Sequence, residues 1–158
     1  MEQLKYTFDQ VNEWIRVADQ KALILGSFNI AGLIYQLINF SNFRHAHGCI
    51  NPLLLISLVL TFTALFLWLR IIYPRLDNTH KKSKIFFQHI ANAYGEDRDS
   101  GIKDLQSFSK EEFERDLASQ IIANSVVAKR KYLYIQRFMW VFGLQLLSMG
   151  ILFISLLR

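Results

Sequence analysis

Three long windows almost without charge constrain this chain more than any other feature of its sequence. Residues 22–40, 52–73 and 138–157 contain one charged side chain, Arg70, near the end of the second window. All other charged residues lie outside these windows, although 20% of the chain is charged. A soluble domain with a single core does not separate its charges in this way. Each window has the roughly 20 residues that an α-helix needs to cross a bilayer, so we expect an all-α membrane protein with three transmembrane helices and a small helical cytoplasmic region.

Positive charges beside the windows predict the orientation of the helices. Segment 74–137 contains twelve Lys and Arg residues, whereas segment 41–51 contains only Arg44 and two histidines. Because cytoplasmic loops carry the excess of Lys and Arg, we expect 1–21 and 74–137 in the cytoplasm and 41–51 as an outer loop. The chain is then a single multi-pass domain over 1–158 with a cytoplasmic N-terminus. The lone cysteine, Cys49, would face outward, either as a bystander or in an intermolecular disulfide.

Polar side chains interrupt the first window more than the other two. Ser27, Asn29, Gln36 and Asn39 lie within it, and Gln145 and Ser148 lie within the third. One interpretation places the amides at the membrane edge or in hydrogen bonds to neighbouring helices. The other interpretation is that they line a polar seam. The sequence leaves both open.

The segments expected in the cytoplasm are helical in pattern. Apolar residues spaced by three and four predict a helix from residue 4 that continues through the first span to residue 40. A short amphipathic helix is expected over 81–94, and a polar turn over 95–101. Ser109 followed by Glu112 has the spacing of a capping box. The helix that it opens is expected to continue into the third span.

The search for catalytic chemistry gives no candidate. The chain has no metalloprotease, dithiol, nucleophile-elbow or P-loop motif, and we expect neither catalytic residues, nor a metal site, nor a cofactor. The net charge of +5 does not indicate a nucleic acid polymer, because lysines next to a membrane span are explained by topology and anionic headgroups. Lys129, Arg130 and Lys131 precede Tyr132, and this group is either a juxtamembrane collar or a site for a small anion.

A second group of charges precedes the first span. Trp14, Arg16, Asp19 and Lys21 lie in the last turns before the bilayer, where charges are costly unless they are paired or solvated. Asp19 has no cation four residues later, so its expected local partner is Arg16. Salt bridges to the helix over 120–132 are one explanation of this group, and contacts to the phosphate and base of a nucleotide are the other.

The string WIRVADQKA at 14–22 resembles the N-terminal signature W-x-x-x-A-D-x-K-A of the Pycsar transmembrane effector family. Further matches follow in order: YPR at 73–75, IFFQHI at 85–90 and DLASQIIANSVVAKRKY at 116–132, before a final hydrophobic span. The resemblance covers roughly residues 11–157.

The resemblance implies an antiphage role in the bacterial inner membrane. In such systems a partner cyclase makes a cyclic pyrimidine nucleotide, cCMP or cUMP, and the effector responds by forming an oligomer and impairing the membrane, which causes abortive infection. The chain has no recognisable cyclic-nucleotide-binding β-barrel, so the ligand would bind to the helical cytoplasmic part of a homo-oligomer. The candidate ligand-binding residues are Trp14, Arg16, Asp19, Lys21, Asn124, Ser125, Lys129 and Lys131.

A different class of function remains compatible with the same sequence. The chain could be a constitutive membrane scaffold that recruits a cytoplasmic partner through its helical connector, without sensing a nucleotide. That hypothesis predicts no response to cCMP or cUMP and a partner that is lost when residues 81–112 are deleted.

Overall fold

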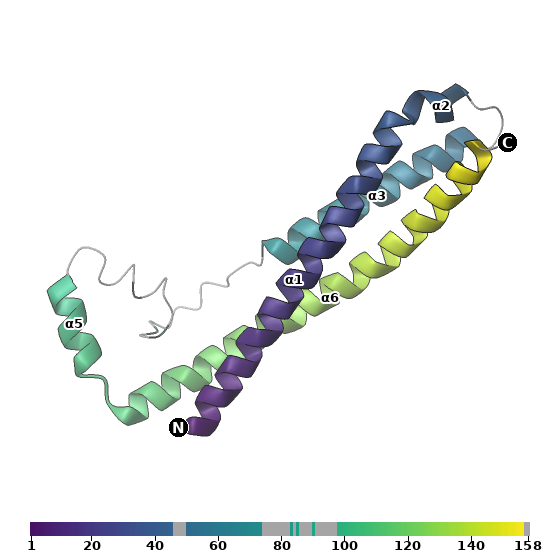
Figure 1. Cartoon of the computed structure of the whole chain (residues 1–158). Helices are drawn as coiled ribbons and strands as arrows, with labels where there is room; N and C mark the ends of the chain where they lie inside the picture. The colour runs from purple at the N-terminus through teal and green to yellow at the C-terminus, as the bar shows by residue number, and fades with distance from the viewer. Residues whose placement is uncertain (46–49, 74–82, 84, 86–89, 91–97, 157–158) are drawn as a thin grey trace. The chain divides into compact units, whose positions relative to one another are not determined.

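The computed structural model describes residues 1–45, 50–73, 83, 85, 90 and 98–156. These residues form helices with short connections, and none of them is in a strand (Figure 1). Three helices are long and apolar enough to cross a membrane, which confirms the predicted all-α membrane fold. Most of the amphipathic helix predicted over 81–94 lies outside the described residues, as does Cys49.

The first helix, α1, covers Glu2–Ile38 without a break. At 1.5 Å per residue it is about 55 Å long, almost twice the ~30 Å thickness of the hydrocarbon core. Its apolar window therefore occupies only the C-terminal half, and the charged N-terminal half extends beyond the hydrocarbon. The predicted continuity of this helix is confirmed. A short helix, α2, follows at Phe40–His45 in the first part of the segment that was expected to be a loop.

The second span is α3, Ile50–Ile72. Pro52 lies in its first turn, where the missing backbone N–H removes no helical hydrogen bond. Helix α5 covers Arg98–Gln106, so the polar turn predicted over 95–101 is wrong for residues 98–101. Asp99 in the first turn of α5 favours the helix there, because a negative charge is stabilised by the N-terminal end of the helix dipole.

The longest helix, α6, covers Lys110–Leu156 and is about 70 Å long at 1.5 Å per residue. Its start has the predicted capping box. The Glu112 backbone N–H donates to the Ser109 hydroxyl over 3.2 Å, and the Ser109 backbone N–H donates to the Glu112 carboxylate over 3.1 Å. The prediction that the helix opened by the capping box continues into the third span is confirmed.

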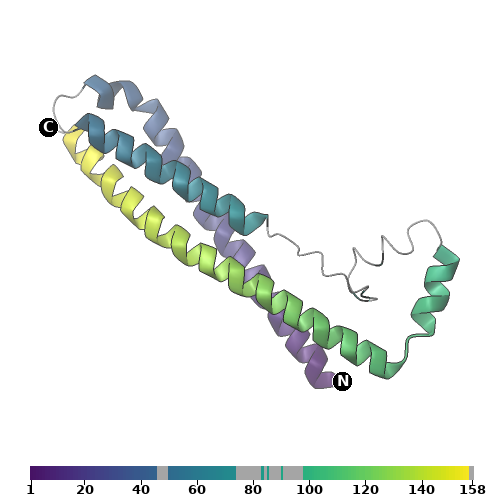
Figure 2. The same ribbon diagram turned by 180° about the vertical axis from the view of Figure 1, so that it is seen from behind.

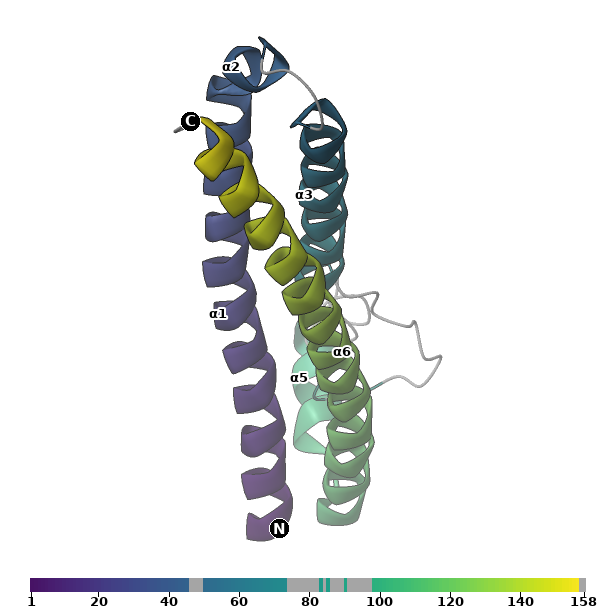
Figure 3. The same cartoon turned by 90° about the vertical axis from the view of Figure 1, so that its right-hand side faces the viewer.

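The chain divides into two compact units. Unit 1 comprises Met1–Arg16 and Arg75–Lys129, and unit 2 comprises Val17–Pro74 and Arg130–Arg158. In unit 2 the C-terminal part of α1, the whole of α3 and the C-terminal part of α6 lie side by side (Figures 2 and 3). These are the three predicted spans.

Two apolar clusters hold the spans of unit 2 together. The first apolar cluster consists of Ala18, Ala22, Ala64, Ile71, Ile135 and Phe138. The second apolar cluster consists of Phe43, Leu54 and Leu152, with Tyr35 packed against it. Each cluster contains residues from α3, from α6 and from either α1 or α2. Three of the first cluster's six members are alanines, and small residues allow helices in a membrane to approach closely.

Gly26 of α1 lies against the side chain of Trp68 of α3. A β-carbon placed on Gly26 would lie 2.1 Å from Trp68 Nε1, so the indole occupies the space of a side chain. The same Nε1–H donates to the carbonyl of Ala22 over 2.9 Å. Glycine is therefore required at this position by the packing of Trp68.

Six polar side chains are buried between the two apolar clusters. Gln36 Nε2 donates to Ser57 Oγ over 2.6 Å, and Thr61 Oγ1 donates to Gln36 Oε1 over 3.1 Å. Gln36 thus bonds to a neighbouring helix, which is one of the two predicted roles for the amides. Asn29 Nδ2 and Gln145 Oε1 are buried and accept or donate no hydrogen bond among the described residues. The polar layer, as we call this set, consists of Asn29, Gln36, Ser57, Thr61, Gln145 and Ser148.

Candidate functional site

The predicted ligand-binding residues lie on α1 and α6, in the turns next to the apolar spans. Both helices are continuous through this region, so the regular helix backbone sets the spacing of the functional groups on each of them. Unit 1 contains five of the eight residues and unit 2 contains three. They are Trp14, Arg16, Asn124, Ser125 and Lys129 in unit 1, and Asp19, Lys21 and Lys131 in unit 2.

Asp19 and Lys131 form an ion pair in unit 2. Lys131 Nζ donates a hydrogen bond to Asp19 Oδ1, which joins α6 to α1. The Lys131 side chain is only 6% exposed, whereas the Asp19 side chain is 43% exposed. A buried ammonium group needs a charged or polar partner, and Asp19 supplies it. The predicted salt bridge to the helix over 120–132 is confirmed, and it occupies two of the eight candidates.

Arg16 has a different partner from the predicted one. Its guanidinium bonds to the Glu13 carboxylate in the preceding turn, 2.6 Å from Oε2, and not to Asp19. The hydrogen bond and the charge of Glu13 raise the pKa of Arg16 above its ordinary value. The expected local pairing of Asp19 with Arg16 is therefore wrong, because Lys131 of α6 pairs with Asp19 and Glu13 pairs with Arg16.

Lys21 lies against an aromatic ring in unit 2. Its Nζ is 5.7 Å from the centroid of the Tyr132 ring, within the range of a cation–π interaction. Both side chains are exposed at the polar end of the spans. Tyr132 was absent from the predicted set, although it directly follows the basic triplet 129–131. An aromatic residue next to clustered cations was the signal that could have identified it.

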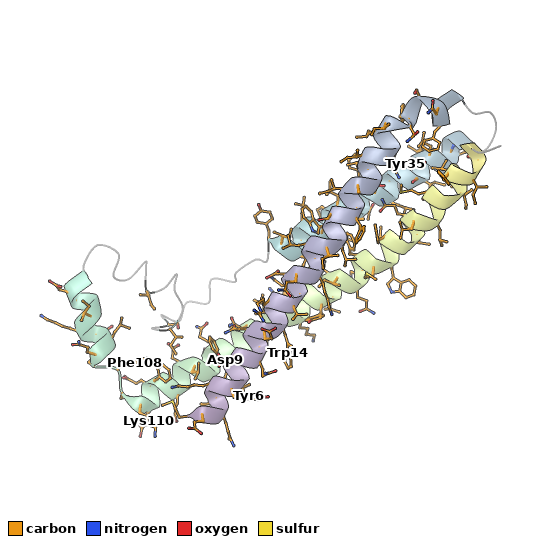
Figure 4. All side chains as sticks on the ribbon, in the orientation of Figure 1. Tyr6, Asp9, Trp14, Tyr35, Phe108 and Lys110 are labelled. Atoms are coloured by element: carbon orange, nitrogen blue, oxygen red, sulfur yellow. The ribbon has the colours of Figure 1, made fainter. Side chains whose placement is uncertain are left out.

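Two candidates of unit 1, Asn124 and Ser125, form hydrogen bonds within the unit, and two others, Trp14 and Lys129, are exposed. Asn124 Nδ2 donates to Asn12 Oδ1 over 2.9 Å, which joins α6 to the N-terminal part of α1. The Ser125 hydroxyl donates to a carbonyl one turn earlier in its own helix. Trp14, labelled on α1 in Figure 4, is 52% exposed, and Lys129 is exposed. Unit 1 therefore presents an indole, an ammonium and a hydroxyl group to solvent or headgroups.

Metal-binding and nucleophilic chemistry find no support in these positions. Within the described part of the chain, no three His, Cys, Asp or Glu residues lie close enough to hold a metal ion. The side chains of all four histidines and of Cys49 lie outside what is described. The eight candidate residues carry ammonium and guanidinium groups, one carboxylate, an amide, a hydroxyl and an indole.

The chain was compared with known protein families, with curated proteins and with solved structures. No curated protein and no solved structure matches it. The Pycsar effector protein domain matches residues 3–157, nearly the full length, and this agrees with the resemblance of the WIRVADQKA string and with the three membrane-spanning helices. The chain therefore belongs to the Pycsar effector family, whose members are antiphage defence effectors, and it is a membrane protein.

Proposed function

We propose that this effector is activated by a cyclic pyrimidine nucleotide, cCMP or cUMP, that a partner cyclase makes during phage infection. Nucleotide binding favours a homo-oligomer that impairs the bacterial inner membrane, and the infected cell dies before phage mature. The protein acts by binding, without a catalytic step or a cofactor. Its N-terminus and the segment over 74–137 face the cytoplasm, where the cyclase product is released.

The observation that best supports nucleotide binding is the pairing of Lys21 with Tyr132. A cyclic pyrimidine nucleotide has one negatively charged phosphate and one flat base. Stacking of a base on an aromatic side chain is worth about 1–3 kcal/mol, and an ammonium group forms a charge-assisted hydrogen bond with a phosphate oxygen. Lys21 and Tyr132 present both groups within 5.7 Å of each other at the end of the spans.

The remaining candidates divide into two roles under this proposal. In unit 1, Trp14 and Lys129 repeat the combination of an exposed ring and an exposed cation, and this unit offers ligand-binding groups of its own. Asp19 and Lys131 hold α1 to α6 and keep the two helices in register. Their role in ligand binding is thus to position Lys21 and Tyr132. Lys21 lies two positions after Asp19, and Tyr132 directly follows Lys131.

Helix continuity explains how binding would reach the membrane. Lys21 is on α1 and Tyr132 is on α6, and neither helix is broken between these residues and its span. A ligand that contacts both side chains changes the spacing of the two helices, and rigid helices carry the change into the bilayer. The ligand shifts the population towards the oligomer only to the extent that it binds the oligomer more tightly than the single chain.

Purified protein in dye-loaded liposomes tests the proposal. We expect cCMP or cUMP to release the dye and to increase the size of the protein complex in detergent, with cAMP and cGMP as nucleotide controls. An absence of both responses to either pyrimidine nucleotide would refute activation by these ligands and would favour the scaffold hypothesis.

A matched pair of variants tests the site itself. Lys21→Gln removes the cation that faces Tyr132, and Arg137→Gln removes a cation that lies at the same 5.7 Å distance from the ring of Tyr134. Loss of a hydrogen bond to a charged group costs about 1.5–3 kcal/mol, which is roughly a tenfold to hundredfold increase in the nucleotide concentration for half-maximal leakage. We expect this increase for Lys21→Gln and little change for Arg137→Gln. Equal responses of the two variants would refute the assignment of Lys21.

A further inference from the structure

We propose that the polar layer is the water-binding section of the path by which the active protein makes the membrane leak, and that the two apolar clusters keep this section dry before activation. The inference rests on the proposed function, because it requires that the nucleotide induces a leak. It adds the route that water and ions take and the residues that line it.

The first support is the order of side chains along the three spans. On α1, Ala22 of the first apolar cluster precedes the polar layer, and the second cluster follows at α2. On α6 the order is the same, from Phe138 to Gln145 to Leu152. On α3, which runs in the opposite direction, the order is reversed. A layer of polar groups is therefore enclosed between two apolar layers in all three spans.

The second support is the hydrogen bonding of the polar layer. Asn29 is 1% exposed and Gln145 is fully buried, yet Asn29 Nδ2 and Gln145 Oε1 have no hydrogen-bond partner in the described part of the chain. The other end of the Gln145 amide has only the sulfur of Met149, at 3.9 Å. Side chains that served only to join helices would be paired, as Gln36 is with Ser57 and Thr61. Unpaired buried amides are costly, and a state in which water reaches them removes that cost.

The third support is the position of Gln145 relative to α1. A β-carbon on Gly32 would lie 3.3 Å from Gln145 Nε2, so the amide lies against the α1 backbone. Asn29 lies one helical turn before Gly32, on the same side of α1. The two unsatisfied amides thus belong to one region of the bundle interior. Lipid does not reach the two amides, because Asn29 and Gln145 are buried, whereas the neighbouring Phe28 and Leu147 face outward.

The chemistry of the layer defines what it conducts. It contains amides and hydroxyls but no charged side chain, so it binds water and hydrates ions of either sign through dipoles. Apolar constrictions close a path by excluding water, and the first apolar cluster, with Phe138 stacked on Phe142 at 5.5 Å, provides such a constriction. The path should accordingly show little preference between cations and anions.

Cysteine accessibility tests the inference in the full-length protein in liposomes, with Cys49 first replaced by Ser. Asn29→Cys and Gln145→Cys place a thiol in the polar layer, and Phe28→Cys and Leu147→Cys place a thiol at a neighbouring position that faces lipid. A charged, membrane-impermeant methanethiosulfonate reagent reacts with the ionised thiolate, which forms only in water. We expect the activating nucleotide to raise the rate of modification roughly tenfold or more at positions 29 and 145, and to leave positions 28 and 147 unreactive.

The outcomes separate the inference from the proposed function. Leakage by the cysteine variants without faster modification at 29 and 145 than at 28 and 147 would place the path elsewhere and overturn the inference alone. Wild-type liposomes that do not leak with any nucleotide would overturn the proposed function and the inference with it. If replacing an amide prevents folding, Ser57→Cys exchanges a single oxygen for sulfur within the same layer and gives the same test.

Discussion

The ion pair between Asp19 and Lys131 should respond very differently to the loss of each partner. Lys131 is buried, with 6% of its side chain exposed, whereas 43% of the Asp19 side chain is exposed. Asp19→Asn leaves a buried ammonium group without a counter-charge. Lys131→Met leaves a carboxylate that water can solvate and fills the lysine's volume with an apolar chain. We therefore expect Asp19→Asn to be the more destabilising substitution, although both remove the same pair.

The exposures set the magnitudes. Removing one partner of a fully buried pair costs about 3–5 kcal/mol, and an exposed pair is worth about 0–1 kcal/mol. Because one partner here is buried and the other is partly solvated, we expect about 2–3 kcal/mol for Asp19→Asn and about 0–1 kcal/mol for Lys131→Met. The double variant should be close to Lys131→Met alone, since no unpaired charge then remains buried. This non-additivity is the signature of two groups in direct contact.

Thermal melting in detergent micelles, followed by tryptophan fluorescence, measures the difference. A change of 1 kcal/mol shifts the melting temperature of a chain of this size by about 2–4 °C. Asp19→Asn should thus melt about 4–12 °C lower than the wild type, on the same scale, and Lys131→Met within a few degrees of it. The argument from burial is wrong if Lys131→Met melts at as low a temperature as Asp19→Asn. It is also wrong if the double variant melts at a lower temperature than both single variants.

Three further changes test packing, capping and the barrier. Gly26→Val should destabilise the bundle by about 1–3 kcal/mol, because a β-carbon there lies 2.1 Å from Trp68 Nε1. The control in the same melting assay is Gly143→Val, because a β-carbon at Gly143 has no atom within 4 Å. Equal melting temperatures of the two variants would contradict the close packing at Gly26. Ser109→Ala should cost about 1 kcal/mol and speed hydrogen exchange in the first turn of α6, and unchanged exchange would show that the cap contributes nothing. Phe138→Ala opens the first apolar cluster and should make liposomes leak without nucleotide, whereas liposomes that stay sealed would show that this cluster is not the barrier.

Much of the fold could be predicted because the insertion of a helix into a membrane depends on the composition of that segment alone. A stretch of about 20 apolar residues forms a helix in lipid whatever its neighbours are, since every backbone polar group must be bonded within the segment. The capping box at Ser109 and the continuity of α1 and α6 depend on residues a few positions apart, and both were predicted. The start of α5 at Arg98 was missed because Gly101 and its polar neighbours have the composition of a turn.

The candidate site was predicted less completely. The region was chosen because charged residues there meet the spans, and the salt bridge from Asp19 to the helix over 120–132, which the structure contains, was one of two interpretations. The pairing of Arg16 with Glu13 and the position of Tyr132 beside Lys21 were not foreseen. Each depends on how two helix faces meet, and the spacing of residues along one helix does not contain that information.

The order of residues along the chain was enough to predict three helices that can cross a membrane and membership of the Pycsar effector family, because both depend on local composition and on short motifs. Which side chains of different helices contact each other could be seen only in the folded bundle. Asp19 and Lys131 are 112 positions apart, and Gly26 accommodates a tryptophan from another helix. The burial of unpaired amides between apolar layers is likewise a property of the packed bundle, since a side chain's cost or use in a membrane depends on what lies opposite it.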